Sequence, residues 1–199
     1  MKSFNVFGGL DLSIYDKKTC ICFIRKKSKF EIVFVKDRIN EADILGYIKK
    51  FNPLYFSIDA PLTWRKIEDR REDKILRKYF NEREMKMPGI LPFYVKSMRE
   101  LSEKGRNLYF KLKKFTKIIE THPTASIRAM GFKEDYKRKR QDFKLLIEKI
   151  KDNFLNIDLI KNHNQLDSLF CALFSYYFYK GENILIVRKK LPYGIVIKF

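Results

Sequence analysis

The stretch Val6-Phe7-Gly8-Gly9-Leu10-Asp11-Leu12-Ser13 decides the fold of this chain. Its apolar residues predict a buried strand, and that strand ends on Asp11. A charge at the end of a buried strand is costly unless a partner neutralises it. Two later segments repeat this arrangement and also end on an acid: Leu54-Tyr55-Phe56-Ser57-Ile58-Asp59 and Lys117-Ile118-Ile119-Glu120. We therefore expect three strands to carry one acid each to a common site.

The segments around the first strand predict a mixed sheet. Short β-type runs at 4–12, 19–25 and 30–36 are joined by short polar connections, which is typical of an antiparallel meander. A helix is expected from Asn40 to Phe51, followed by the strand that ends on Asp59. A strand, a helical crossover and a strand place the first and fourth strands parallel and adjacent.

The remaining segments complete a three-layer α/β domain over 1–199 with helices on both faces. The mixed sheet is expected to have five strands, in the order 3-2-1-4-5, with a helical insertion at about 65–115. Helices are predicted at 67–84, at 95–114 with a possible break at Gly105, at 123–130, at 141–154, and from Gln165 to Lys180 after Asn164. A closing hairpin is expected to pair 184–187 with 195–199.

Composition limits the partners of the protein. Hydrophobic residues make up 45% and aromatic residues 15% of the 199 residues, which excludes a disordered chain. The 43 Lys and Arg against 24 Asp and Glu give a net charge of +19. This excess favours a polyanionic partner, either nucleic acid or an anionic membrane surface, and argues against a small cationic substrate. A solvated basic surface without a partner would give the same count.

The sequence favours a cytoplasmic protein without membrane segments. The longest mostly apolar run, 169–179, is far shorter than the ~20 residues of a spanning helix. No signal peptide is expected, because the chain starts with a single Lys before a β-like strand that Asp11 interrupts. The cysteines are odd in number and lie in apolar segments, so we expect them to be reduced packing residues.

The acids predict a divalent-metal site. Open α/β sheets bind their ligands at the carboxyl ends of parallel strands, where Asp11, Asp59 and Glu120 fall. Three converging carboxylates do not all stay ionised without a cation, and Mg²⁺ or Mn²⁺ prefers oxygen ligands. Asp167, in the first turn of the last long helix, is the fourth candidate. The alternative for Asp167 is a capping role at that helix start.

These segments together resemble an uncharacterised family of predicted nucleases with an RNase H-like fold, a domain of unknown function. The resemblance covers nearly the whole chain and is carried by motifs in this order: Gly9-Leu10-Asp11-Leu12-Ser13, Ile58-Asp59-Ala60-Pro61-Leu62, Arg70…Asp73…Leu76-Arg77, Met87-Pro88…Leu91-Pro92, Ile119-Glu120-Thr121-His122-Pro123-Thr124-Ala125-Ser126, Tyr136-Lys137 and Leu166-Asp167-Ser168-Leu169-Phe170-Cys171-Ala172.

The resemblance implies an RNase H-like core with Asp11, Asp59, Glu120 and Asp167 at the metal-site positions. The chain departs from the family at Asn164. Such families, and the Holliday-junction resolvases they look like, often carry an acid one helical turn before the last Asp. A carboxamide donates an oxygen ligand without a charge, so Asn164 would hold a second metal ion more weakly. Resolvase-like enzymes act as dimers, so a homodimer is also to be considered.

Arg70, Asp73 and Arg77 are spaced to share one face of a predicted helix. In a functional role, the two arginines would bind a substrate phosphate beside the metal ions and Asp73 would orient them. In a structural role, the three side chains would form an exposed ion-paired stripe.

Three further residues are candidates for substrate contact. His122 follows Glu120 closely and would act as a general base or an extra ligand, although a His before Pro more often caps or packs. Lys137 lies in the densest basic run, 136–140, which would follow a nucleic-acid backbone. Trp64 would stack on a base or pack in the core.

The leading hypothesis is a metal-dependent nuclease that hydrolyses phosphodiester bonds in DNA or RNA, with Mg²⁺ or Mn²⁺. The alternative is a non-catalytic nucleic-acid-binding protein with one structural cation. Phosphoryl transfer, as in sugar kinases and actin-like ATPases, is a weaker third hypothesis. Those enzymes need a second large lobe, and the chain shows no second Gly-rich phosphate loop.

Overall fold

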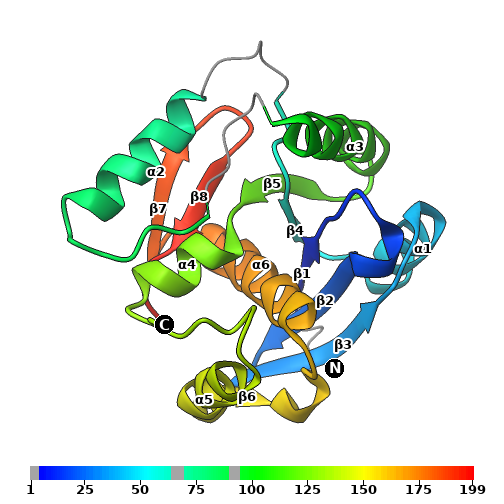
Figure 1. The fold of residues 1–199 in the computed structure, drawn as a ribbon. Coiled ribbons are helices and arrows are strands. Elements are labelled where there is room, and N and C mark those ends of the chain that lie inside the picture. The colour runs from blue at the N-terminus through cyan, green and yellow to red at the C-terminus, as the bar shows by residue number, and fades with distance from the viewer. Residues whose placement is uncertain (1–4, 64–69, 90–94) are drawn as a thin grey trace.

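A computed structural model describes residues 5–63, 70–89 and 95–199 of the chain. The described strands form one sheet of eight strands in the order β6-β3-β2-β1-β4-β5-β8-β7 (Figure 1). They are β1 (Val6–Asp11), β2 (Cys20–Lys26), β3 (Phe30–Asp37), β4 (Tyr55–Asp59), β5 (Lys117–Thr121), β6 (Phe154–Leu155), β7 (Ile184–Arg188) and β8 (Tyr193–Val196).

The predicted order 3-2-1-4-5 is confirmed at the centre of this sheet, and the predicted number of five strands is wrong. β1, β2 and β3 form the antiparallel meander, and β1 is parallel to β4, which is parallel to β5. The closing hairpin forms, but β8 also pairs parallel to β5 and extends the sheet. The two-residue strand β6 adds to β3 at the other edge.

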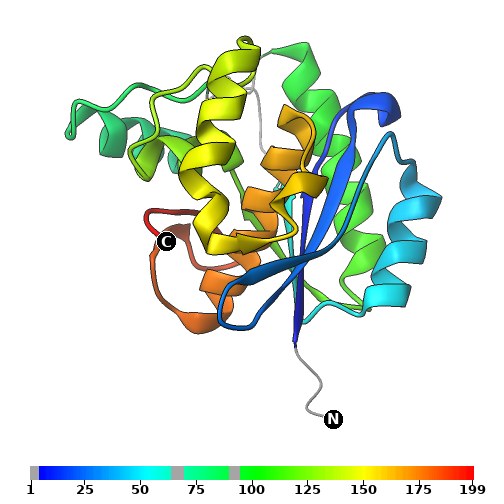
Figure 2. The same cartoon turned by 90° about the horizontal axis from the view of Figure 1, so that it is seen from below.

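Helices cover both faces of the sheet, as Figure 2 shows. The helices are α1 (Glu41–Phe51), α2 (Arg71–Asn81), α3 (Lys96–Leu112), α4 (Pro123–Ala129), α5 (Arg140–Ile150) and α6 (His163–Lys180), with short 3-10 turns η1 (Asp16–Lys18), η2 (Lys151–Asn153) and η3 (Ile157–Leu159). One core cluster lies between the sheet and α1 and α3, and a second lies between the sheet and α5 and α6.

The helix boundaries confirm one predicted helix start and correct two other predictions. Asn40 caps α1 in a full capping box, as its position predicted. The possible break at Gly105 does not occur, because α3 runs through this residue where the helix packs closely on Ala60. α6 starts two residues earlier than predicted, since Asn162, not Asn164, accepts the capping hydrogen bond from the Gln165 amide.

The second glycine of the opening stretch sets the position of α6. A Cβ atom at Gly9 would lie 2.1 Å from the Ala172 nitrogen and 2.4 Å from the Ser168 oxygen, so α6 crosses β1 in backbone contact. Ser57 and Ser175 are hydrogen-bonded at 2.6 Å, and Ser175 also donates to the Gly8 carbonyl at 2.7 Å. This close crossing brings the first turns of α6 to the carboxyl end of β1.

All three cysteines are buried and unbridged, as predicted for packing residues. Among the residues that the structure describes, no helix is long and apolar enough to cross a membrane.

Candidate active site

Asp11 and Asp59 end two neighbouring parallel strands and are paired directly in register. Residues paired in this way point to the same face of a sheet. That face is covered by α6, whose Asp167 is buried in the second turn of the helix. Three elements that are far apart in the sequence thus bring three aspartates together at the carboxyl edge of the sheet.

The titration behaviour of these acids reflects their proximity. Burial raises the pKa of Asp11 well above its ordinary range, and the negative charges of Asp167 and Asp59 raise it further. Burial also raises the pKa of Asp59 to about 7, with Lys137 opposing this change and Asp167 adding to it. The cluster therefore holds more negative charge than its own surroundings stabilise, which is the condition under which a cation binds.

Asp167 is held by two neighbouring residues of the loop before α5. The Tyr136 hydroxyl donates a hydrogen bond of 2.5 Å to Asp167 Oδ1, and the Lys137 ammonium lies 2.7 Å from Asp167 Oδ2. Burial opposes the charge on Lys137, but Asp167, Asp59 and Asp11 together raise its pKa. Lys137 is thus a positive charge that faces all three aspartates.

Glu120 belongs to a different set of contacts. It pairs with Ile58, one residue before Asp59, so strand alternation turns its side chain to the other face of the sheet. Its Oε1 accepts a hydrogen bond of 2.5 Å from Arg70, and its Oε2 accepts bonds from Arg188 at 2.8 Å and from the Leu62 amide at 3.0 Å. Glu120 therefore holds the buried guanidinium group of Arg70 and the partly exposed one of Arg188.

The three residues of the predicted Arg70–Asp73–Arg77 stripe have different positions. Arg70 precedes α2 and forms two hydrogen bonds of 2.8 Å with Asp73, so this pair is buried and not an exposed stripe. Arg77 is half-buried on α2 and does not line the cavity at the acids. The structure thus places Arg70 and Asp73, but not Arg77, at the predicted site.

His122 serves as the N-terminal cap of α4. Its Nδ1 accepts a hydrogen bond of 3.4 Å from the Ala125 amide. Burial, followed by the charges of Lys137 and Arg70, lowers the pKa of His122 to about 3. A base this weak is poorly matched to proton transfer near neutral pH, which favours the capping role.

Two further candidates remain to be placed. Asn164 is half-buried in the first turn of α6, three residues before Asp167, and so lies on the same side of the helix. Trp64 lies outside the described residues.

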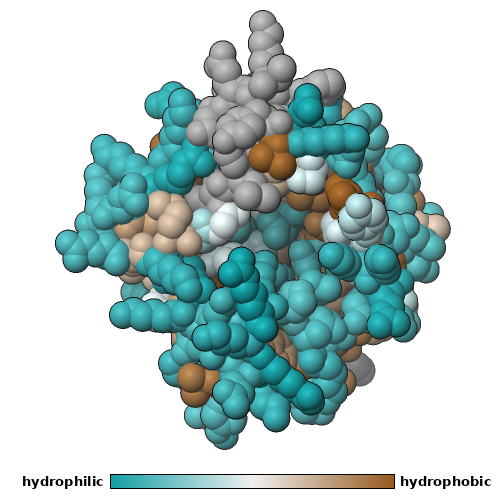
Figure 3. All heavy atoms as spheres, in the orientation of Figure 1, coloured by the Kyte–Doolittle hydropathy of each residue, from teal (hydrophilic) through white to brown (hydrophobic). Residues whose placement is uncertain are grey.

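A cavity of about 360 Å³ opens beside the acids, with Asp59, Arg70, Glu120, His122 and Lys137 among its lining residues. A neighbouring cavity of about 270 Å³ shares Gly89, Thr124 and Lys137 with it. The second cavity adds the basic side chains of Lys86, Arg128 and Arg138. With Asp135 as the one acid among its described lining residues, this second cavity has an excess of positive charge beside the aspartate cluster. Hydrophilic residues dominate the visible face of the molecule (Figure 3).

The donor set fits a divalent cation of the Mg²⁺ type. Asp11, Asp59 and Asp167 would supply oxygen ligands, and burial together with the charges of neighbouring acids raises the pKa values of Asp11 and Asp59. In residues 5–63, 70–89 and 95–199, no three His, Cys, Asp or Glu side chains are already arranged around a common metal position. The Lys137 ammonium and the Tyr136 hydroxyl occupy the two oxygens of Asp167. A cation would therefore compete with Lys137 for Asp167.

Arg188 is the site residue that sequence reasoning missed. It ends β7 and contacts Glu120, Glu72 and Thr63. Its only signal in the sequence is a charge at the end of an apolar strand, the same signal that marks Asp11. The sequence prediction left the closing hairpin outside the five-stranded sheet, so it gave the Arg188 guanidinium no partner.

The comparisons with known proteins give the fold. No protein-family model matches the chain, and no curated protein matches it. Among solved structures, Thermus thermophilus RuvC in complex with a Holliday junction substrate matches with a TM-score of 0.50 and 12% identity, over 89% of this chain and 96% of that chain. A second Thermus thermophilus RuvC structure matches with a TM-score of 0.48 and 12% identity, over 96% and 99% of the two chains. The chain therefore has the RNase H-like fold found in RuvC.

Proposed function

We propose that this protein is a divalent-metal-dependent nuclease that cleaves phosphodiester bonds in DNA or RNA. The observation that carries the proposal is the meeting of Asp11, Asp59 and Asp167 at the carboxyl edge of the sheet, with the pKa values of Asp11 and Asp59 raised. The RNase H-like fold supports it, as does the excess of positive charge that Lys86, Arg128 and Arg138 give to the neighbouring cavity.

In this proposal the three aspartates hold Mg²⁺ or Mn²⁺, and Asn164 contributes a neutral oxygen ligand. The bound metal would activate water and stabilise the charge that develops on the phosphate and the leaving oxygen. Because Lys137 is paired with Asp167, a cation on Asp167 would displace its ammonium, which would then be available for a substrate phosphate. We expect tighter metal binding at higher pH, where fewer protons compete for Asp59.

Glu120 has a supporting role in the same proposal. With its two oxygens occupied by Arg70, Arg188 and Leu62, it fixes the Arg70 guanidinium at the wall of the cavity and the Arg188 guanidinium behind it. Both hydrogen bonds from Arg70 to the Asp73 carboxylate are also formed. The Arg70 guanidinium, fixed by Glu120 and Asp73, would thus provide a positive charge in a defined position near a phosphate bound at the aspartates.

The decisive experiment is a cleavage assay on single-stranded, duplex, RNA–DNA hybrid and four-way-junction substrates, in Mg²⁺ and Mn²⁺. The junction is included because the RuvC neighbour is bound to a Holliday junction. Cleavage by the wild type that is abolished in Asp59→Asn supports the nuclease. Asp158→Asn, an exposed acid in η3, is the matched control and should cleave normally.

The variant Asn164→Asp tests whether the neutral carboxamide of Asn164 limits metal binding. Restoring an acid one turn before Asp167 should tighten Mn²⁺ binding and increase the cleavage rate at low metal concentration. Light scattering at several protein concentrations tests the homodimer that the resemblance to resolvase-like enzymes suggests.

The alternative is a nucleic-acid-binding protein without catalysis. The occupation of both Asp167 oxygens by Tyr136 and Lys137 favours it. Substrates that are retarded at low salt but stay intact, equally for the wild type and Asp59→Asn, would establish this alternative.

A further inference from the structure

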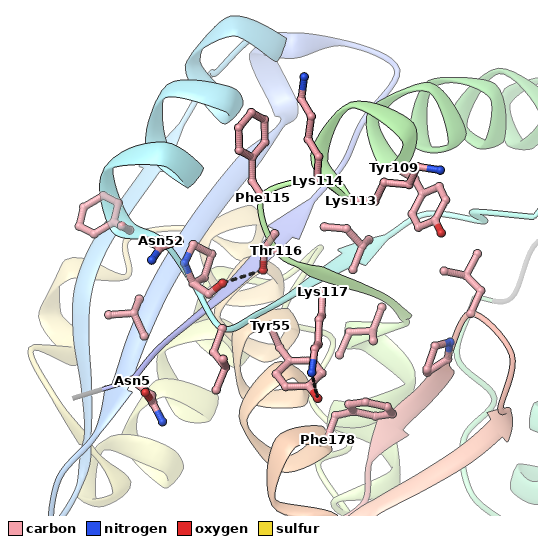
Figure 4. Close-up of a pocket in the computed structure, with 18 residues that line it drawn as sticks. Asn5, Asn52, Tyr55, Tyr109, Lys113, Lys114, Phe115, Thr116, Lys117 and Phe178 are labelled. Carbon is pink, nitrogen blue, oxygen red and sulfur yellow. Dashed lines mark hydrogen bonds between the residues drawn. The ribbon is translucent and has the colours of Figure 1, made fainter. Parts of the chain in front are cut away.

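A third and larger cavity lies at the amino ends of β4 and β5, opposite the ends that carry the acids. It has a volume of about 970 Å³ and is lined by the first residues of β4 and β5, by the chain that leaves α1 and α3, and by Leu191 and Pro192 (Figure 4). Tyr55 and Asp59 occupy the two ends of β4, about 13 Å apart at the rise of a β-strand, and none of Asp11, Asp59 and Asp167 lines this cavity. It is a separate place on the molecule.

The charged residues that line this cavity are all positive among those described. Lys113, Lys114 and Lys117 line it, and the described lining residues include no Asp or Glu. All three lysines are exposed, and the Lys117 ammonium reaches the Tyr55 hydroxyl at 3.5 Å (Figure 4). Concentrated positive charge in a concave surface attracts an anion.

Aromatic rings lie between these lysines. The Lys117 ammonium is 5.2 Å from the centre of the Tyr55 ring, and the Lys114 ammonium is 5.1 Å from that of Phe115. Lys113 lies over Tyr109 at 5.8 Å. The three rings are only half-buried, so part of each ring is accessible from the cavity. Aromatic faces beside lysines are the pattern by which proteins bind unpaired bases and their phosphates.

A purely structural explanation covers only part of this arrangement. Lys113 and Lys114 follow the C-terminus of α3, where cations stabilise the helix dipole. Lys117 opens a strand and receives no such stabilisation. Core packing accounts for the buried part of Tyr55, Tyr109 and Phe115, but it does not account for the exposed parts of all three rings lining one cavity.

We propose that this cavity binds one nucleotide unit, with its phosphate at Lys113 and Lys117 and its base against Tyr55 or Tyr109. The ligand is an unpaired nucleotide of a single strand, because stacking on Tyr55 or Tyr109 requires a base whose face is free. The inference does not depend on the proposed nuclease, since none of the aspartates takes part.

Binding is measured by fluorescence anisotropy with a labelled pentathymidylate, in EDTA and in the Asp59→Asn background, so that cleavage does not enter. Lys113→Gln/Lys117→Gln should weaken binding and lower the slope of log affinity against log salt by roughly 0.7 for each phosphate that the variant no longer neutralises. Tyr109→Ala should weaken binding about tenfold at constant salt slope, which is within the range for removal of one base stack. Lys29→Gln/Lys144→Gln removes the same charge at exposed positions outside the cavity and should leave binding near wild type.

Crosslinking locates the strand independently. A pentathymidylate with one photoreactive thiothymidine should attach to 52–55 or 109–117 of the wild-type protein. Attachment only to the basic cavity at 86–89 and 124–138 overturns the proposal, as does equal weakening by the control pair of substitutions. Thymidine monophosphate that competes where inorganic phosphate does not identifies the nucleotide as the ligand, whereas equal binding of an oligoglutamate contradicts it.

Discussion

Removal of the Asp59 carboxylate should make the metal-free protein more stable at neutral and alkaline pH. A carboxyl group whose pKa is higher in the folded state binds its proton more tightly there than in the unfolded chain. Its contribution to stability is therefore complete below the unfolded pKa, near 4, and is lost as the pH rises through the folded value of about 7. Asp59→Asn is uncharged at every pH and does not undergo this loss.

The magnitude follows from the two pKa values. The ordinary value for Asp is 3.8 and the folded value is about 7. This difference corresponds to roughly 4 kcal/mol, at ~1.4 kcal/mol for each tenfold change in proton affinity. Asp59 is half-buried and shares its proton equilibrium with Asp11, so the part assigned to Asp59 alone is about 2 kcal/mol.

Urea unfolding followed by circular dichroism, in EDTA at pH 4 to 8, measures this effect. The free energies of unfolding of the wild type and Asp59→Asn should differ little at pH 4. At pH 8 the variant should be more stable by about 2 kcal/mol. Asp158→Asn controls for the loss of one negative charge from a protein with a net charge of +19.

Added Mn²⁺ should make the wild type more stable than Asp59→Asn at pH 8. The wild type gains ~2.7 kcal/mol when the free ion is at one hundred times its dissociation constant, whereas Asp59→Asn gains little. The reasoning is refuted if Asp59→Asn is less stable than the wild type in EDTA at pH 8, because the carboxylate would then stabilise the fold through Lys137.

Three further predictions concern the packing and charges around the site. Gly9→Ala should lower the free energy of unfolding by at least ~1–3 kcal/mol in urea titrations, because its Cβ would meet the α6 backbone, whereas Gly46→Ala in open space should not destabilise. Arg70→Ala leaves Glu120 and Asp73 buried with fewer partners, so thermal and urea unfolding should show a loss of ~3–5 kcal/mol; a loss no larger than that of Arg77→Ala would contradict the buried network. Lys137→Met removes the competitor for Asp167 and should tighten Mn²⁺ binding in calorimetry, and weaker binding would show that Lys137 assists the metal.

The position of the aspartates followed from short-range patterns. Asp11 and Asp59 each ended an apolar run, and parallel strands joined by crossovers bring their carboxyl ends to one edge. The direct pairing of Asp11 with Asp59 bears out the placement of these two residues side by side. Gly9 was part of the same stretch, and its missing side chain is what admits α6 and hence Asp167.

What the sequence did not determine depends on register and on the pairing of distant segments. The pairing of Glu120 with Ile58 turns its side chain away from the face of Asp59, and a shift of one residue would reverse this. The meeting of Arg188 with Glu120 requires β8 to pair with β5, and these strands are about 70 residues apart, so no local pattern specifies it. The sequence alone determined which acids end strands, because propensity and periodicity act over a few residues. Only the tertiary structure decided which charges neutralise them, because that depends on where the folded chain places Lys137, Arg70 and Arg188.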